Sequence, residues 1–196
     1  LKILATLIIP TSGSVCVNGY DIMKNEEQVR ASIGLVTGNE RSVYWRLTGR
    51  ENLEFYAALY KLNRKERVKQ IDTLTEVLEL SDFLDKRIKE YSAGMIQRLC
   101  LARGLLHNPK VLLLDEPTKS LDIQTAHNLR YYIKETLAKE KGITVLFSTH
   151  QPDEAEFLAD RIALIEKGVI KEVNPVRKDG FTINDWLSNG VKNLKE

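Results

Sequence analysis

The hydrophobic pattern of the chain is most distinctive at its centre, where four consecutive apolar residues precede two adjacent carboxylates. The apolar run 111–114 shows no alternation, and Pro109 and Pro117 lie on either side of the segment. Such a short continuous run is typical of a strand that is buried on both faces of a parallel sheet. Because ligands bind at the carboxyl ends of such strands, we predict that Asp115 and Glu116 stand at the mouth of a site. The alternative is that two acids merely end a strand and face solvent.

Further short strands are predicted on both sides of this segment. Alternation that ends in Asn18-Gly19 is typical of a hairpin, and Lys167-Gly168 joins two short runs near the end of the chain. The runs predicted as strands are 14–19, 33–36, 143–147, 161–166 and 169–173. The run 143–147 is continuous like the central one, so we predict a second buried strand there.

Helical spacing of apolar residues dominates the stretch after residue 47. Thr48 and Glu51 fit a capping box, and a second amphipathic segment follows with Val68 and Ile71 on its apolar side. We interpret 48–90 as a helical lobe inserted into an α/β core, with its aromatic positions serving packing. The other predicted helical segments are 1–8, as the end of a helix stopped by Pro10, then 27–31, Ser92 to about 108, Asp122 to about 139, and 153–159.

Composition places the chain with ordinary soluble globular proteins. Of its 196 residues, 43% are apolar and 29% are charged, and Lys+Arg 29 against Asp+Glu 27 leave a net charge of +2. This balance gives no support to a nucleic-acid footprint or a polybasic membrane anchor. Cys16 and Cys100 match no metal spacing and favour a reducing cytosol. No apolar run reaches the length of a membrane span, so we expect any connection to a membrane to come through a partner.

The order strand, helix, strand between residues 111 and 150 predicts a βαβ unit with parallel strands. One strand ends in Asp115 and Glu116, and His150 follows the other, so we expect these polar groups at the same edge of the sheet. If the strands are neighbours, Glu116 and His150 converge on one small volume. A lone histidine after a strand is more often structural, but one that faces a carboxylate pair favours a site.

Phosphate chemistry accounts for these residue types. The Mg²⁺ of a nucleoside triphosphate takes oxygen ligands, and Asp115 suits that role. Glu116 would orient or deprotonate the water that attacks the γ-phosphate, and His150 would contact that phosphate. The Ser-Ala-Gly run at 92–94 opens a helix whose free amides and dipole suit a phosphate, although capping explains these small residues equally well.

Three segments, taken together and in this order, resemble the nucleotide-binding subunit of ATP-binding-cassette (ABC) transporters. They are YSAGMIQRL from Tyr91, VLLLDEPTKSLD from Val111 and VLFSTH from Val145. In that family the corresponding segments are the signature motif, the Walker B strand with the D-loop (here Ser120 to Asp122), and the switch histidine. The resemblance runs from the start of the chain to about residue 173. It implies an α/β fold: a RecA-like P-loop NTPase core with an antiparallel β part and an inserted helical subdomain.

The resemblance also implies boundaries and residue roles, with ATP and Mg²⁺ as ligands. The implied parts are 1–47 (first part of the ATP-binding core), 48–95 (helical subdomain with the signature motif), 96–173 (the rest of the core) and 174–196 (C-terminal tail). The implied site residues are Glu116 and His150 for catalysis, Asp115 for the metal, and Ser92, Ala93, Gly94 and Asp122 for the nucleotide.

The sequence departs from the family pattern at several positions. The phosphate-binding loop G-x-x-x-x-G-K-[ST] does not occur in these 196 residues, and the chain starts inside a helix-like pattern, so we expect a segment upstream. The family has a glutamine loop near Gly38, but no glutamine stands there, and Asn39 or Glu40 is the expected substitute. Ala93 replaces the middle glycine of the signature motif, and Met95 replaces its polar last residue.

By resemblance, we expect an ATP-hydrolysing subunit that powers transport by a membrane-spanning partner and lies peripherally at the cytoplasmic face of the membrane. We also expect a second ATP-binding cassette, identical or not, and no nucleic acid; the stretch 39–47 favours an export-type subunit. Without the phosphate-binding loop, we expect weak or absent hydrolysis by these 196 residues alone. The alternative is a non-hydrolysing degenerate cassette, or a truncated fragment, that binds ATP only in trans through its signature motif. A soluble ABC ATPase that acts on ribosomes or DNA is a third hypothesis.

Overall fold

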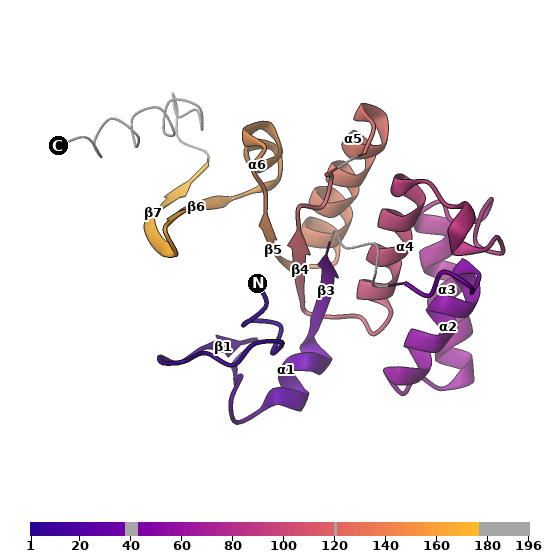
Figure 1. The fold of residues 1–196 in the computed structure, drawn as a ribbon, viewed down its shortest axis with the longest axis horizontal. Coiled ribbons are helices and arrows are strands. Elements are labelled where there is room, and N and C mark those ends of the chain that lie inside the picture. The colour runs from indigo at the N-terminus through magenta and orange to yellow at the C-terminus, as the bar shows by residue number, and fades with distance from the viewer. Residues whose placement is uncertain (38–42, 120, 177–196) are drawn as a thin grey trace. The chain divides into compact units, whose positions relative to one another are not determined.

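The computed structural model describes residues 1–37, 43–119 and 121–176, which fall into two compact units, Leu1–Ser148 and Thr149–Glu196. In chain order, the first unit begins with β1 (Cys16–Val17), β2 (Tyr20–Asp21), α1 (Glu26–Ser32) and β3 (Ile33–Thr37) (Figure 1). The helices α2 (Gly49–Leu59) and α3 (Arg64–Val77), the 3-10 turn η2 (Ile88–Glu90) and α4 (Ala93–Leu105) follow. The unit ends with β4 (Val111–Asp115), α5 (Ile123–Tyr131), the π-helical segment η3 (Tyr132–Glu140) and β5 (Thr144–Ser148). The second unit contains α6 (Pro152–Leu158), β6 (Arg161–Glu166) and β7 (Val169–Pro175). In the described ranges, no helix is long and apolar enough to cross a membrane.

The first unit is built around a parallel sheet whose strands follow the order β3-β4-β5. The leucines at 112–114 in the central strand are at most 1% exposed, as expected for a strand covered on both faces. Thr37, Asp115 and Ser148 occupy matching register positions at the carboxyl ends of the three strands. The predicted parallel pairing is therefore confirmed, and the strands end along one edge of the sheet.

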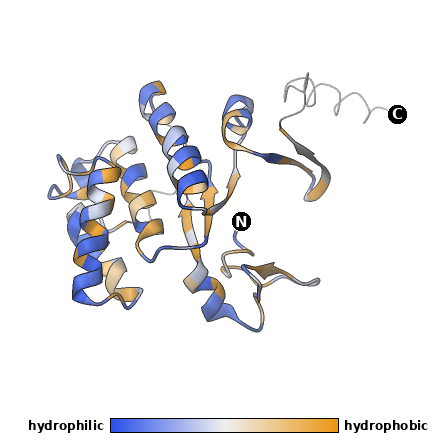
Figure 2. Ribbon diagram, turned by 180° about the vertical axis from the view of Figure 1, so that it is seen from behind, coloured by the Kyte–Doolittle hydropathy of each residue, from blue (hydrophilic) through white to orange (hydrophobic). Residues whose placement is uncertain are grey.

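Helices α2, α3 and α4 pack together, and α4 lies against β3 (Figure 1). Both α2 and α3 begin with a capping box: Thr48 Oγ1 accepts from the Glu51 N–H at 3.1 Å, and Asn63 Oδ1 accepts from the Glu66 N–H at 3.0 Å. These side chains satisfy amides that a helix start leaves open, as predicted for Thr48. Figure 2 shows apolar residues concentrated in the strands of the sheet, while the helices carry polar residues along much of their length.

Two glycines let α4 approach the sheet closely. A Cβ atom on Gly34 in β3 would overlap the carbonyl oxygen of Gly104 in α4. A Cβ atom on Gly104 would in turn stand 2.8 Å from Cγ2 of Val36. No side chain larger than hydrogen fits at Gly34 without moving the backbone of α4, so this contact sets the position of that helix.

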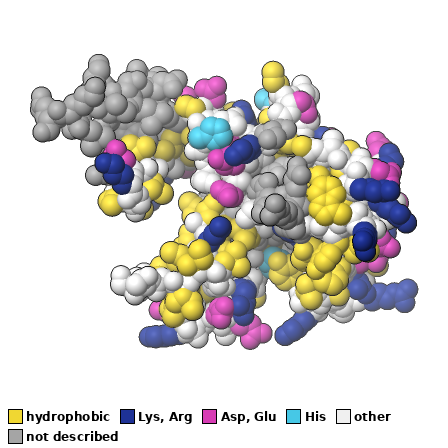
Figure 3. Space-filling model, viewed as in Figure 1, with side chains coloured by type: hydrophobic (Ala, Val, Ile, Leu, Met, Phe, Trp, Pro, Cys, Tyr) yellow, Lys and Arg dark blue, Asp and Glu magenta, His cyan; other side chains and the backbone are white. Residues whose placement is uncertain are grey.

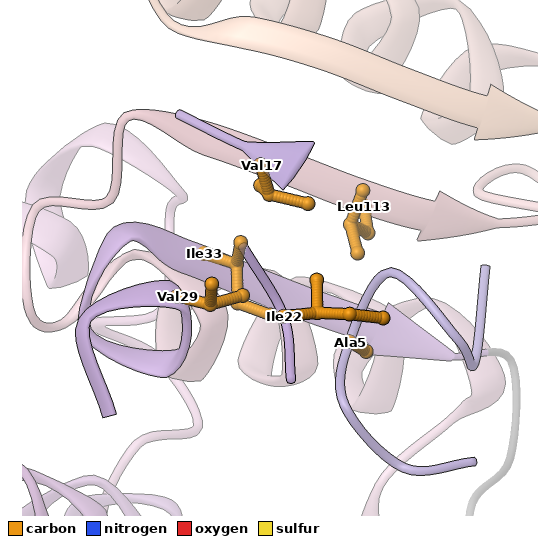
Figure 4. Close-up of a cluster of buried hydrophobic side chains, with 6 residues drawn as sticks. All are labelled: Ala5, Val17, Ile22, Val29, Ile33 and Leu113. Atoms are coloured by element: carbon orange, nitrogen blue, oxygen red, sulfur yellow. The ribbon is translucent and has the colours of Figure 1, made fainter. Parts of the chain in front are cut away.

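A cluster of buried side chains joins the first segments of the chain to the sheet (Figure 4). Its members come from the opening turn, the β1–β2 hairpin, α1, β3 and β4, and they are Ala5, Val17, Ile22, Val29, Ile33 and Leu113. The hairpin itself turns at Asn18-Gly19 with φ values of 51° and 81°, which the type I′ turn requires. The predictions of a hairpin at 14–19 and of a short helix at 27–31 are thereby confirmed.

The opening residues form one turn with helix-ending hydrogen bonds. The Ala5 N–H donates to Leu1 O at 3.0 Å and the Leu7 N–H donates to Lys2 O at 2.9 Å, while Thr6 has a φ of 59°. A left-handed residue with a bond that spans six residues is the Schellman arrangement that ends helices. These bonds agree with the predicted end of a helix at 1–8, which the structure shows as a closing turn.

The second unit carries an antiparallel hairpin, in which β6 pairs with β7. The hairpin turns at Lys167-Gly168, with φ values of 49° and 81°, as predicted. Helix α6 starts at Pro152, whose fixed φ suits a first helical position. The boundaries predicted at 47, 95 and 173 remain predictions, and residues 177–196 of the predicted tail lie outside the described residues.

Candidate active site at the carboxyl edge of the sheet

Asp115 lies at the last position of β4, between the ends of the two neighbouring strands. Its side chain is exposed, and its Oδ1 accepts a hydrogen bond from the Ser148 hydroxyl at 2.6 Å. Thr37 occupies the matching position on the other side. The hydroxyl of Ser148 therefore fixes one carboxylate oxygen at an edge that also carries Thr37. Exposed oxygen donors of this kind suit Mg²⁺, which usually binds through one or two carboxylates together with water and substrate phosphates.

The next residue, Glu116, leaves the strand through a backbone conformation that few non-glycine residues adopt. Its φ is 50°, and its N–H donates to Ser148 O at 3.0 Å. Strand β4 therefore ends at Asp115, between the two carboxylates. The positive φ at Glu116 breaks the side-chain alternation of the extended strand, so the turn sets the direction of its carboxylate.

The Glu116 carboxylate forms an ion pair with Lys119, whose Nζ lies 2.6 Å from Oε2. The hydrogen bond to Glu116 raises the pKa of the Lys119 ammonium above its ordinary value. The ammonium side chain is 60% exposed and the Glu116 side chain 28% exposed, so the pair lies at the surface. As a surface ion pair, it contributes little to stability.

Side chains from two helices hold the turn that follows Glu116. Gln97 of α4 donates from Nε2 to Pro117 O at 2.8 Å. Arg130 of α5 donates from Nη2 to the hydroxyl of Thr118 at 3.4 Å, and Thr118 is only 3% exposed. The Lys119 N–H donates to Glu116 O at 3.1 Å, and this hydrogen bond closes the turn. Side chains of α4 and α5 therefore hold the segment that follows the carboxylates.

The predicted phosphate-contact residues stand at the start of α4. Ser92 is the N-cap: its hydroxyl accepts from the Met95 N–H at 3.3 Å, and its own N–H donates to the Met95 sulfur at 3.3 Å. Ser92 and Ala93 are exposed, and Gly94 is half-buried. The first amides of a helix have no intrahelical acceptor, so this end presents donors and the positive end of the helix dipole. The predicted cap is confirmed, and a nucleotide contact remains a prediction.

Asp122 caps α5, the helix that follows β4. Its Oδ1 accepts from the Thr125 N–H at 2.9 Å. Hydrogen bonds from the Thr125 side chain and backbone hold the pKa of the Asp122 carboxyl below its ordinary value. This local role accounts for an acid at this position, so its predicted nucleotide contact stays a prediction. Ser120 of the predicted D-loop lies outside the described residues.

His150 follows β5 by two residues and belongs to the second unit. The prediction that His150 lies near Glu116 concerns a contact between the two units, and it remains a prediction. The predicted substitutes for the glutamine-loop residue, Asn39 and Glu40, fall at 38–42, outside the described residues. The strand that leads to them ends at Thr37, at the same edge as Asp115.

Sequence reasoning missed four residues that build this edge: Ser148, Lys119, Gln97 and Arg130. Ser148 left a signal, because it ends the run predicted to pair with the strand of Asp115. Lys119 lies three residues after Glu116, but only the left-handed turn brings the two side chains together. The contacts of Gln97 and Arg130 join segments 20 and 12 residues apart in the chain, and no local pattern predicts them.

No group of three or more His, Cys, Asp or Glu side chains with metal-binding geometry occurs in the part of the chain that the structure describes. A cage of that kind suits a resident structural metal. A nucleotide-associated Mg²⁺ needs fewer protein ligands, since phosphates and water complete its octahedron. The donor set of Asp115 with Ser148 and Thr37 fits the second case.

Comparison with known proteins places this edge in a family context. The family model described as ABC transporter matches residues 1–119. The chain is 35% identical over 170 residues to the ABC transporter ATP-binding protein NatA of Bacillus subtilis (strain 168), and the aligned region is 87% of this chain and 68% of NatA. The matched regions of this chain cover smaller shares, 59% and 54%, of two further curated relatives from the same organism. The chain therefore spans little more than half the length of those two relatives.

Solved structures share the fold. The dimeric ATP-binding cassette MJ0796, in a post-hydrolysis state bound to ADP and Pi, has a TM-score of 0.78 at 26% identity, covering 90% of this chain and 79% of that one. A structure of cbiO1 from Clostridium perfringens, part of the ABC transporter complex cbiONQ, has a TM-score of 0.78 at 24% identity, covering 89% and 70%. These likenesses confirm the predicted α/β fold with a RecA-like core.

Proposed function

The chain belongs to the ABC transporter family, and from this premise we propose that it is part of an ATP-binding subunit that hydrolyses ATP to power transport by a membrane-spanning partner. The observation that carries the proposal is the pair Asp115 and Glu116 at the carboxyl edge of the parallel sheet. The same fold holds ADP and Pi in the cassette MJ0796. Ligands of open α/β sheets bind at this edge, so the acids stand where a nucleotide would be.

Asp115 is the residue that would hold Mg²⁺. Its exposed carboxylate is oriented by the Ser148 hydroxyl, which engages Oδ1 at 2.6 Å. Thr37 and Ser148 flank it with further hydroxyl groups. When bound there with ATP, Mg²⁺ would supply charge neutralisation of the phosphates. The role of the chain is to present an oxygen-rich edge in a fixed orientation.

Glu116 would orient the attacking water and accept its proton. Glu116 lies in the turn that follows β4, whereas Asp115 ends the strand, so the metal and the water would be served by different acids. The carboxylate is the form of Glu116 that accepts a proton, and Lys119 pairs with it at 2.6 Å. His150 would contact the γ-phosphate from the second unit, in line with its place after β5 in the sequence.

The start of α4 would serve a second cassette. Ser92 and Ala93 are exposed at a helix N-terminus, where amide donors suit the phosphates of a nucleotide held by another subunit. In this arrangement, one subunit's residues 92–94 face the nucleotide of its partner, and Asp122 lies beside that contact. The dimeric state of the cassette MJ0796 supports a pair of cassettes.

An exposed aromatic surface supports a membrane-spanning partner that holds the subunit at the membrane. Its members come from the segment before α2 and from α2 itself, and they are Tyr44, Trp45, Phe55, Leu59 and Tyr60, all at least 37% exposed. Figure 3 shows hydrophobic side chains at the surface beside the helices. The predicted packing role of these aromatic positions therefore applies in part, since Phe55 contacts Tyr44 edge to face at 4.9 Å but stays exposed. Tyr44 and Phe55 form an exposed aromatic pair, and exposed apolar patches are typical of protein interfaces.

The alternative is a non-hydrolysing degenerate cassette, or a truncated fragment, that binds ATP only in trans. A subunit of that kind would bind nucleotide through residues 92–94 of α4 and would leave Asp115 and Glu116 without a catalytic task. Substitution of either acid would then leave the hydrolysis rate of the assembled transporter unchanged.

The direct test is the Mg²⁺ dependence of ATP hydrolysis by the complete transporter, assembled from the full chain and its membrane partner. Asp115→Asn should lower the rate at least about 100-fold at millimolar Mg²⁺, because the metal loses its charged ligand. Asp72→Asn, which changes an exposed acid on α3, is the matched control and should keep the wild-type rate. Equal rates and equal Mg²⁺ dependence in the wild type and Asp115→Asn would refute the proposed role.

A further inference from the structure

Gln97 makes a contact that the proposed catalytic scheme does not use. It lies in the first turns of α4, three residues after Gly94, and its side chain is half-buried. Its Nε2 donates to the carbonyl oxygen of Pro117 at 2.8 Å. Pro117 is buried and directly follows Glu116. A side chain from the signature helix thus binds the backbone next to the proposed catalytic carboxylate.

The turn that Gln97 contacts fixes the direction of Glu116. Glu116 has a φ of 50°, its N–H is bound to Ser148 O, and its carbonyl accepts from the Lys119 N–H at 3.1 Å. The Pro117 carbonyl lies inside this turn and points to α4. Loss of its donor would leave a buried acceptor unsatisfied and would free the turn to relax toward an ordinary backbone conformation.

Packing at the start of α4 reinforces this connection. The methyl group of Thr125 and the Leu121 side chain stand 3.5 and 3.8 Å from the place that a Cβ on Gly94 would take. The start of α4 is therefore in contact with the segment that follows the turn at Glu116. Residues three or four apart on a helix share a face, so Gln97 and Gly94 lie on the same side of α4.

We infer that Gln97 is a positioning residue that fixes the Glu116 turn and ties it to the start of α4. The inference rests on the proposed function, in which Glu116 serves the nucleotide of its own subunit and residues 92–94 serve that of the second cassette. A displacement of the α4 start by a nucleotide would be transmitted through Gln97 to the backbone that holds Glu116. Gln97 thereby links the two nucleotide sites of a cassette pair.

The test compares ATP hydrolysis by the complete transporter with Gln97→Met and Gln97→Lys. Methionine keeps the length of the side chain but has no donor, and it should lower kcat about 10- to 100-fold with KM for ATP changed less than about twofold, because orientation of the base is lost while binding is kept. Lysine keeps an N–H donor and should restore kcat to within about threefold of the wild type. A wild-type kcat in Gln97→Met, or an equal loss in Gln97→Lys, would overturn the inference.

Gln70→Met is the matched control. The Nε2 of Gln70 also donates to a backbone carbonyl, that of Leu105 at 3.2 Å, and to Asn108 Oδ1 at 3.0 Å, away from the Glu116 turn. Gln70→Met should therefore leave kcat at the wild-type value. If Gln70→Met lowered kcat as much as Gln97→Met, general loosening of α4 would explain the effect and the positioning role would be refuted.

The link between the sites is tested by a double-mutant cycle of Gly94→Ala and Gln97→Met. Coupled residues should give a combined loss in kcat smaller, by at least about fivefold, than the product of the separate losses. Multiplicative losses would refute the link. Failure of the proposed function gives a different result, because Asp115→Asn would then keep the wild-type rate of ATP hydrolysis, whereas failure of this inference leaves the loss in Asp115→Asn intact.

Discussion

Glu116 holds a conformation that costs free energy. Left-handed φ values raise the energy of a non-glycine residue by roughly 1–2 kcal/mol, and Glu116 has a φ of 50°. Hydrogen bonds from its backbone to Ser148 and Lys119 keep it there. Strain at one residue of a site is maintained only where the surrounding structure enforces it. The surrounding hydrogen bonds therefore hold Glu116 in a conformation that glycine would adopt more easily.

We expect Glu116→Gly to be more stable than Glu116→Ala by about 0.5–1 kcal/mol, because glycine adopts positive φ freely. Both substitutions remove the carboxylate and the ion pair with Lys119, so their difference reports the backbone alone. Urea unfolding of the two variants measures it. Equal free energies of unfolding would mean that the turn stores no strain.

Sequence alone located the residues of this edge whose positions depend on local rules. Strand ends and helix caps follow from a few neighbouring residues, so Asp115, Ser92 and Asp122 were found at the predicted places. Contacts that depend on register or on a left-handed turn were missed. The hydrogen bond of Ser148 to Asp115 needs the exact pairing of two strands, and no capping or turn rule supplies it.

At the scale of elements, the approach of α4 to β3 is the feature most sensitive to a small change. We expect Gly34→Ala to lower the free energy of unfolding by at least about 2 kcal/mol, because the new Cβ overlaps the Gly104 carbonyl. Gly94→Ala is the control: a Cβ there finds ordinary contacts at 3.5 Å or more, and alanine favours a helix by up to about 1 kcal/mol. Thermal unfolding of both variants measures the difference. Similar melting temperatures would contradict the close packing.

The types and the order of the elements follow from hydrophobic periodicity, which was clear for β3, β4 and β5 and for α2 to α5. Their packing partners do not follow from it. The Gly34–Gly104 contact joins residues 70 positions apart, and either glycine by itself reads as a weak point in a strand or a helix. Helix α5 continues as the π-helical segment η3, a change in hydrogen bonding that no amphipathic pattern distinguishes.

At the scale of the whole molecule, His107 makes stability depend on pH. Its Nε2 lies 2.8 Å from Ile33 O, and because a carbonyl only accepts, the neutral ring carries its proton on Nε2. Nδ1 is buried without a partner among the described residues, and the ring stacks on Tyr60 at 3.9 Å. Burial lowers the pKa of His107 below its ordinary value, and the hydrogen bond to Ile33 opposes this only in part.

The sign of the effect follows from the lowered pKa. The unfolded chain binds the proton at higher pH than the folded one, so stability is complete above about pH 6.5 and falls as the pH drops toward the folded-state pKa. We expect His107→Gln, which keeps an N–H donor for Ile33 O, to remove this slope between pH 7 and 5. Urea unfolding at several pH values measures it. An unchanged slope in His107→Gln would assign the dependence to other groups.

The fold class and the family were accessible from the sequence, because several motifs occur together in one order and each is tied to the end of an element. The placement of His150 was not. It belongs to the unit that starts at Thr149, and periodicity says nothing of contacts between units. The region 38–42, where the family has its glutamine loop, is likewise beyond what local patterns predict.

The central claim, that Glu116 acts in ATP hydrolysis, is tested most directly by Glu116→Gln in the complete transporter. Glu135→Gln is a close control, because Glu135 also pairs with a lysine three or four residues on, at 2.7 Å, and its side chain is 29% exposed against 28% for Glu116. The measured quantities are the ATP hydrolysis rate and ATP binding. We predict a loss of at least about 100-fold in hydrolysis with binding retained for Glu116→Gln, and wild-type values for Glu135→Gln. Hydrolysis by Glu116→Gln within a few-fold of the wild type would contradict the account.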